Sequence, residues 1–76
     1  MPSIRPINHR LFEKFLLHIG CYPDRQVGDH KIYKRAGLTR PLVVRIKKDL
    51  PIMEIRSNLK TLGISNEEYL AILENL

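Results

Sequence analysis

Apolar residues recur at helical spacing in three stretches of the chain, and they alternate with polar residues in between. The first helical stretch follows Asn8, whose side-chain oxygen can accept hydrogen bonds from the free amides of a first turn. Gly20 then provides the left-handed residue that commonly ends a helix. The pattern predicts a helix between these two residues, with an apolar face formed by Leu11, Phe12, Phe15, Leu16 and Ile19.

Three shorter segments carry strand signals. Residues 21–25 are the weakest, because Pro23 cannot donate a ladder hydrogen bond and fits only an edge strand or a bulge. Residues 30–35 follow the break at Gly28, and residues 40–47 give the clearest signal. In this last segment two alternating sets predict one buried and one largely basic face: Leu42, Val44 and Ile46, against Val43, Arg45 and Lys47.

Two further helices are expected toward the C-terminus. Pro51 suits the first position of a helix, with Asp49 as a candidate cap, and Gly63 would end it. The apolar stripe of this helix is Ile52, Ile55, Leu59 and Leu62. Ser65 and Glu68 form a capping box that starts a short third helix. Its residues Tyr69, Leu70 and Leu73 are expected to complete the core, in preference to forming an exposed seam for a partner.

The order of helix, three strands, helix and short helix predicts an α+β fold. We expect a small three-stranded antiparallel sheet with the helices packed on one face, in a single domain over residues 1–76. The opposite face would stay open and would carry the basic strand residues. Such a surface is suited to lie against a nucleic acid.

Composition narrows the class of protein. Hydrophobic residues make up 43% and charged residues 28% of the 76, a globular balance. No apolar run reaches the roughly 18 residues of a membrane span, and the N-terminus lacks the pattern of a signal peptide. Cys21 is the only cysteine, so it cannot form an internal disulfide, and we expect it to be a small buried residue. These features predict a cytoplasmic protein without membrane association.

The net charge of +5 is unevenly distributed. Residues 25–60 hold ten basic and three acidic side chains, a net of +7, whereas residues 61–76 carry three glutamates and no Lys or Arg. The middle of the chain therefore favours an anionic partner. A merely solvated surface is the alternative explanation for such a charge run.

Few residues are candidates for chemistry. The sequence has no phosphate-binding loop, no dinucleotide fingerprint and no His-Glu-x-x-His pair, so neither a cofactor nor a metal site is predicted. His9 and His18 lie in the first helix without a catalytic context. His30 differs, because it follows Gly28 and Asp29 at the start of a strand, among cations. An imidazole there could move the proton of an RNA 2′-hydroxyl, although a surface histidine after a turn is the simpler alternative.

The segment at residues 28–33, Gly-Asp-His-Lys-Ile-Tyr, resembles the Gly-x-His-x-aromatic segment of the HicA family of bacterial toxins. Residues 40–44 resemble the Arg-Pro-apolar third strand of that family, and residues 55–69 resemble its closing helix and Gly-Ile-Ser-x-Glu-Glu-aromatic tail. Two positions depart from the family pattern: Asp29 stands where Ser or Lys is common, and Cys21 stands where Phe is common.

The resemblance implies a fold similar to the double-stranded-RNA-binding domain and the activity of an mRNA interferase, an endoribonuclease that arrests translation. It implies His30 as the catalytic residue, with Gly28 and Asp29 positioning its loop. It also implies two partners, mRNA and a HicB-type antitoxin that covers the RNA surface. The expected RNA-binding residues are Lys31, Lys34, Arg35, Arg40, Arg45 and Lys47. We expect cleavage without a metal; a non-catalytic RNA-binding module and a protein-docking domain are the alternatives.

Overall fold

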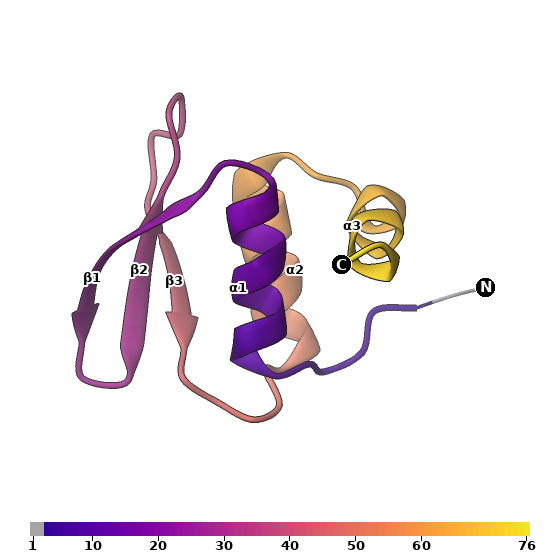
Figure 1. Cartoon of the computed structure of the whole chain (residues 1–76), viewed down its shortest axis with the longest axis horizontal. Helices are drawn as coiled ribbons and strands as arrows, with labels where there is room; N and C mark the ends of the chain where they lie inside the picture. The colour runs from indigo at the N-terminus through magenta and orange to yellow at the C-terminus, as the bar shows by residue number, and fades with distance from the viewer. Residues whose placement is uncertain (1–2) are drawn as a thin grey trace.

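The computed structural model describes residues 3–76 and has the predicted α+β architecture. Its elements are α1 (His9–His18), β1 (Tyr22–Val27), β2 (His30–Lys34), β3 (Leu42–Arg45), α2 (Ile52–Leu62) and α3 (Asn66–Glu74). The strands form one antiparallel sheet in the order β1-β2-β3. Helices α1 and α2 cover one face of this sheet, and α3 lies on the far side of these two helices (Figure 1).

The helix ends follow most of the predicted signals. The Asn8 side chain accepts a hydrogen bond from the Arg10 amide at 2.9 Å, and Gly63 ends α2 with a left-handed φ of 73°. The Ser65 hydroxyl accepts from the Glu68 amide at 3.1 Å, so half of the predicted capping box is present. The prediction for Pro51 was wrong by one position: it is the N-cap of α2, and neither Asp49 nor another described residue provides a side-chain cap bond.

The displaced start of α2 has a visible cause in the N-terminal segment. Ile7 and Leu50 form an isolated β-bridge, in which the Leu50 amide donates to the Ile7 carbonyl at 2.7 Å. This bridge holds Leu50, the residue before Pro51, outside the helix, and Pro51 itself has an extended backbone. The helix therefore begins at Ile52, and the Pro51 carbonyl accepts from the amides of Glu54 and Ile55.

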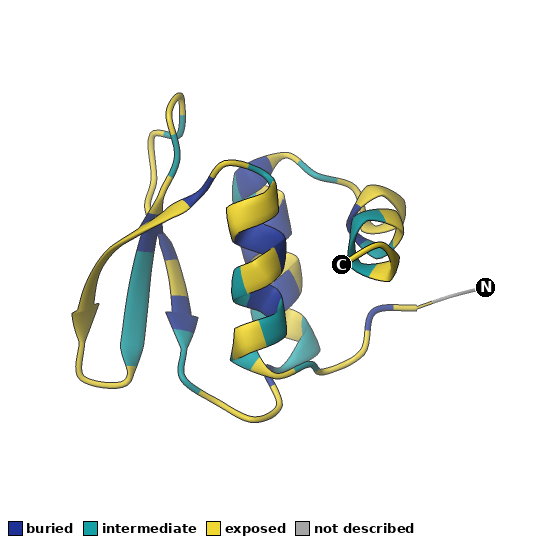
Figure 2. Ribbon diagram, viewed as in Figure 1, coloured by how far each residue is buried: buried dark blue, intermediate teal, exposed yellow. Residues whose placement is uncertain are grey.

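An aromatic cluster fills the layer between the helices. Phe12 and Phe15 of α1 meet Tyr69 of α3, and the rings of Phe15 and Tyr69 lie edge to face at a centroid distance of 4.9 Å. All three residues are fully buried. Figure 2 shows in dark blue the buried parts of α2 and β3, which border the same core. Tyr69 therefore completes the core as predicted, although it packs against the helix layer and not directly on the sheet. Leu70 and Leu73 are partly buried beside it.

The strand register assigns each side chain to one face of the sheet. Tyr33 pairs with Leu42 and Lys31 pairs with Val44, and these four residues face the helices. The open face, which no helix covers, carries the remaining alternate positions: Tyr22, Arg25, Val27, His30, Ile32, Lys34, Val43 and Arg45. It is thus a mixture of apolar and basic side chains. Residues 40–47 were predicted as one strand, whereas β3 covers only Leu42–Arg45, so Lys47 lies outside the sheet and only Val43 and Arg45 of the predicted basic face belong to it.

Helix α2 closes the outer edge of β3. The Asn58 side-chain amide donates to the Val43 carbonyl at 3.3 Å, and Glu54 accepts from the Arg45 amide at 3.1 Å. These two side chains lie one helical turn apart, so they match the spacing of outward-pointing backbone groups on the strand. No residue within 3–76 covers the outer edge of β1 in a comparable way, and all six residues of this strand are exposed.

A partly buried carboxylate joins α1 to the sheet. Glu13 accepts a short hydrogen bond from the Tyr33 hydroxyl and lies 3.4 Å from the Lys31 amine. The Tyr33 hydrogen bond, with a smaller contribution from Lys31, holds the pKa of Glu13 below its ordinary value. Burial and the neighbouring carboxylate raise the pKa of Tyr33. The contact therefore favours an ionised Glu13 and a neutral Tyr33.

Candidate functional site

The turn between β1 and β2 presents His30 at one end of the open face. Gly28 adopts a φ of 60°, and the Gln26 side-chain amide donates to its carbonyl at 3.0 Å. The next carbonyl, that of Asp29, accepts from the Ile46 amide at 2.7 Å. The turn is therefore held on both sides, by the strand before it and by the segment that follows β3.

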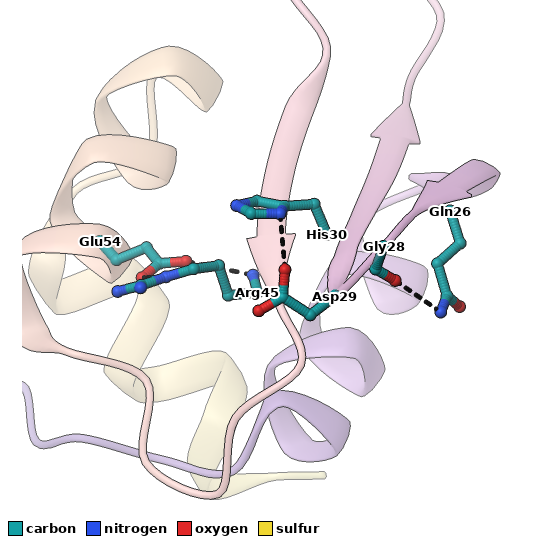
Figure 3. A network of polar contacts seen from close by, with 6 residues as sticks. All are labelled: Gln26, Gly28, Asp29, His30, Arg45 and Glu54. Atoms are coloured by element: carbon teal, nitrogen blue, oxygen red, sulfur yellow. Dashed lines mark hydrogen bonds and ion pairs between the residues drawn. The ribbon is translucent and has the colours of Figure 1, made fainter.

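The Asp29 and His30 side chains form a pair. Asp29 Oδ1 lies 2.9 Å from His30 Nδ1 (Figure 3), and the histidine side chain retains 45% of its exposure. The carboxylate accepts from Nδ1, which selects the tautomer or charge state with a proton on that nitrogen. No residue of the described chain forms a hydrogen bond with Nε2, so this nitrogen is open to a ligand from solution.

Arg45 lies directly opposite His30 in the register of β2 and β3. Its Nε is 3.2 Å from Glu54 Oε2, so its guanidinium is partly committed to α2 (Figure 3). The pairing fixes the side chain beside the imidazole and leaves its terminal nitrogens without a hydrogen bond to the described residues. Arg45 thus provides donors next to His30, and Glu54 offsets part of its charge.

Lys47 lies at the same end of the molecule, two residues after Arg45. It lines a hollow of about 320 Å³ together with Lys48, His9 and Arg10 at the start of α1. The His9 amide donates to the Lys47 carbonyl at 3.0 Å, which ties the hollow together. Arg10 and Lys48 were not among the predicted site residues. Lys48 follows Lys47 in sequence, whereas Arg10 reaches this end of the sheet only through the long-range contact between α1 and the segment after β3.

Lys31, although adjacent to His30 in sequence, lies on the opposite face of the sheet. Its register partner Val44 is buried under the helices, and its amine contacts Glu13. Successive strand residues alternate between faces, so the side chain next to a catalytic candidate points away from it. The structure does not bring Lys31 together with the other predicted cations.

Lys34, Arg35 and Arg40 gather at the other end of the sheet, around the loop between β2 and β3. They line a hollow of about 480 Å³, which we call the β2–β3 hollow, together with Tyr22 and Arg25. Asp24 lies 2.8 Å from Arg25 and 3.6 Å from Lys34, and Arg35 donates weakly to the Ile19 carbonyl at 3.5 Å. Apart from Lys31, the predicted cations therefore form two groups, one near each end of the open face.

Other candidate chemistry finds little support in the part of the chain that the structure describes. Cys21 is buried, and burial raises the pKa of its thiol, which disfavours the nucleophilic thiolate. Within residues 3–76, no three His, Cys, Asp or Glu side chains come close enough together to hold a metal ion. No helix in this range has both the length and the apolar character needed to cross a bilayer.

The fold and the site thus define a class of protein: small α+β proteins with a Gly-x-His turn at the end of an open sheet face. Comparison with models of protein families matches residues 10–64 to the HicA toxin of bacterial toxin–antitoxin systems. The chain belongs to the HicA toxin family. The match includes the His30 turn and all three strands, whereas α3 follows the matched residues. No curated protein and no solved structure matches the chain.

Membership of this family makes the chain a toxin component, and toxins of the family pair with antitoxins. The family pattern around His30 was recognisable from sequence, because its residues are contiguous. The exposure of Tyr22 was not predicted, since an aromatic residue in a weak strand next to Pro23 gives no signal that distinguishes an exposed ring from a core ring.

Proposed function

We propose that the protein is an endoribonuclease that cleaves mRNA, and that His30 is its catalytic residue. The observation that supports this best is the Asp29–His30 pair, in which Nδ1 is held at 2.9 Å and Nε2 is left open. In this proposal Nε2 takes the proton of a ribose 2′-hydroxyl. The resulting alkoxide attacks the adjacent phosphorus, the bond to the 5′-oxygen breaks, and water protonates the leaving oxygen. The products are a 2′,3′-cyclic phosphate and a 5′-hydroxyl.

RNA carries its own nucleophile, so the protein has only to position the phosphate and move a proton. Arg45, opposite His30 in the sheet, and Lys47, two residues further on, are the predicted cations at this end of the sheet and would bind the phosphate. Their charge would stabilise the additional negative charge that develops on the phosphoryl oxygens. Asp29 would stabilise the imidazolium formed during the reaction through a charge-assisted hydrogen bond. It acts as a positioning residue, because it contacts His30 and not the substrate.

The test is cleavage of a long single-stranded RNA by the purified full chain, with and without a chelator. We expect cyclic phosphate ends, no effect of the chelator, and a rate that falls roughly 10²- to 10⁴-fold in His30→Ala. His18→Ala is the matched control, because His18 is exposed on α1 and should retain the full rate. Growth arrest on expression in a bacterium should follow the same pattern. A His30→Ala protein that cleaves as fast as the parent would refute the proposal.

Asp29 permits a second, sharper comparison. Asp29→Asn retains a hydrogen-bonding side chain but loses the charge, so the rate should fall by about tenfold or more and its dependence on pH should shift. An equal rate and an unchanged pH profile would show that the carboxylate has no part in the reaction.

For the partner, we propose a HicB-type antitoxin that covers the His30 end of the open face. The net charge of +5 favours an acidic surface on this antitoxin. Charge reversal at Lys47, which is exposed, should weaken the complex more at low salt than at high salt.

A further inference from the structure

Tyr22 is the only exposed residue among the Phe and Tyr side chains, all of which the structure describes. The chain has three Tyr, two Phe and no Trp. Phe12, Phe15, Tyr33 and Tyr69 are buried to at least 99%, whereas Tyr22 is 52% exposed on the open face. Its hydroxyl forms no hydrogen bond with any described residue. The ring is therefore available to a ligand, and neither core packing nor a hydrogen bond accounts for it.

The surroundings of this ring are cationic. Tyr22 lies opposite Lys34 in the register of β1 and β2 and lines the β2–β3 hollow. Asp24 pairs with Lys34 and Arg25, so these two cations are partly neutralised. Arg40 is exposed and forms no ion pair with a described residue. The hollow thus combines an aromatic face with at least one uncommitted positive charge.

The cationic surface continues beyond the loop. Arg40 also lines a second hollow of about 400 Å³, which includes Lys60 of α2 and the hydroxyl-bearing residues Thr39 and Ser57. Hydroxyl and guanidinium groups are common ligands of phosphate oxygens. The phosphates of a nucleic-acid strand that passes Tyr22 would therefore find further hydrogen-bond donors in this second hollow.

We propose that Tyr22 stacks on an unpaired base of single-stranded RNA, while Arg40 and Lys34 bind the neighbouring phosphates. This inference rests on the proposed function, because it assumes that RNA lies along the open face. Stacking on aromatic rings within a positively charged groove is the common mode of single-strand binding. A base in a duplex is already stacked on both sides, so the subsite selects unpaired RNA.

The subsite lies at a defined distance from His30. Four residue steps along β2 separate His30 from Lys34, which at about 3.4 Å each is about 14 Å. A stacked strand covers this distance in about four nucleotides at about 3.4 Å each, and an extended strand in fewer. The base bound by Tyr22 is thus a few nucleotides from the cleaved bond, and very short RNAs cannot occupy both places.

The experiment measures affinity in the His30→Ala protein, so that cleavage does not interfere. The probe is a labelled single-stranded RNA of twelve nucleotides, in a series that shortens to two. Tyr22→Ala should weaken binding of the twelve-nucleotide RNA roughly 5- to 150-fold, and Tyr22→Phe should not, because the ring remains. Met53→Ala is the control for loss of an exposed apolar side chain, on α2. The effect of Tyr22→Ala should vanish for a duplex of equal length, and the affinity of the parent surface should fall once the RNA is too short to reach from His30 to Tyr22.

Salt dependence separates stacking from charge. Arg40→Ala should reduce the slope of log affinity against log salt by about one, whereas Tyr22→Ala should leave the slope unchanged. Chemical nitration gives a direct readout, because Tyr22 is the only exposed tyrosine. Bound RNA should protect it, and Tyr22→Phe should abolish the reaction of the folded protein.

The possible failures are distinguishable. Binding that depends on Tyr22 in a parent protein that cleaves nothing would refute the nuclease and leave the subsite standing. A parent that cleaves RNA, with Tyr22→Ala binding as tightly as Tyr22→Phe, would overturn the subsite alone. If Tyr22→Ala binds RNA as tightly as the parent but binds the antitoxin more weakly, the proposed base-stacking subsite is also overturned. The ring then belongs to the interface with the antitoxin.

Discussion

Removing the hydroxyl of Tyr33 is the most direct test of how α1 is held on the sheet. The substitution Tyr33→Phe retains the buried ring and opens no cavity. It removes only the donor that contacts Glu13, and Lys31 remains as the other partner of that carboxylate. Any loss of stability can therefore be assigned to one charge-assisted hydrogen bond.

The magnitude follows from the chemistry of the pair and the size of the chain. A hydrogen bond to a charged group contributes about 1.5–3 kcal/mol, and we take about 2 kcal/mol because the Glu13 side chain retains 28% exposure. A chain of 76 residues unfolds with an entropy of about 160 cal/mol/K near its midpoint. The expected loss thus corresponds to a fall in Tm of about 12 °C.

The assay is thermal and urea unfolding of parent and variant between pH 3 and pH 8. The pKa of Glu13 is lowered in the fold, so its contribution is present above its ordinary value of 4.5 and is lost as the pH falls through its folded value. The difference between parent and Tyr33→Phe should be constant near neutrality and should narrow in acid. What remains there is the neutral hydrogen bond, about 0.5–1.5 kcal/mol.

Tyr22→Phe is the matched control, because it makes the same chemical change on an exposed ring and should leave Tm unchanged within about 1 °C. A double-mutant cycle with Glu13→Gln should show a coupling energy of at least about 1 kcal/mol. Equal Tm values for Tyr33→Phe and the parent, or a difference that does not change with pH, would refute this account of the contact.

Three further outcomes are expected. Burial raises the pKa of Tyr33 and brings that of Tyr69 to about 12. The free energy of unfolding should therefore be steady from neutrality to about pH 10 and should fall above it, as urea titrations can measure. Tyr69→Phe should leave the stability unchanged or raise it by up to about 2 kcal/mol in the same titrations, because the buried hydroxyl has no partner among the described residues. Asn58→Ala should cost about 1–3 kcal/mol, because it leaves the Val43 carbonyl without its donor, and faster amide exchange in β3 should accompany this loss.

Local signals in the sequence were sufficient to predict the order of the helices and strands. Asn8 and Gly63 mark helix ends through their own side chain or backbone preference, so no distant contact was needed to predict them. The start of α2 was misplaced, because the bridge between Ile7 and Leu50 joins residues far apart in sequence. Element ends set by tertiary contacts leave no local pattern.

The candidate site divides in the same way. His30 was predictable because Gly28 and Asp29 are its neighbours in sequence. Lys31 is separated from Lys34 and Arg45 because it lies on the face of β2 that meets the helices. Side chains of a strand alternate between the two faces, so the burial of Tyr33 is sufficient to assign Lys31 to the same face. The pairing of Arg45 with Glu54 was not readable, because it depends on how α2 lies against β3.

The side chains of Asn58 and Glu54, which α2 places along the edge of β3, also determine where a further strand could join the sheet. A further strand cannot join the sheet on that side, because Asn58 and Glu54 already occupy the backbone groups it would need. On the other side, Pro23 and the irregular pairing before Arg25 leave only the last part of β1 with regular outward backbone. Any protein that extended this sheet would therefore run beside Arg25–Val27 and arrive next to the turn that carries the imidazole.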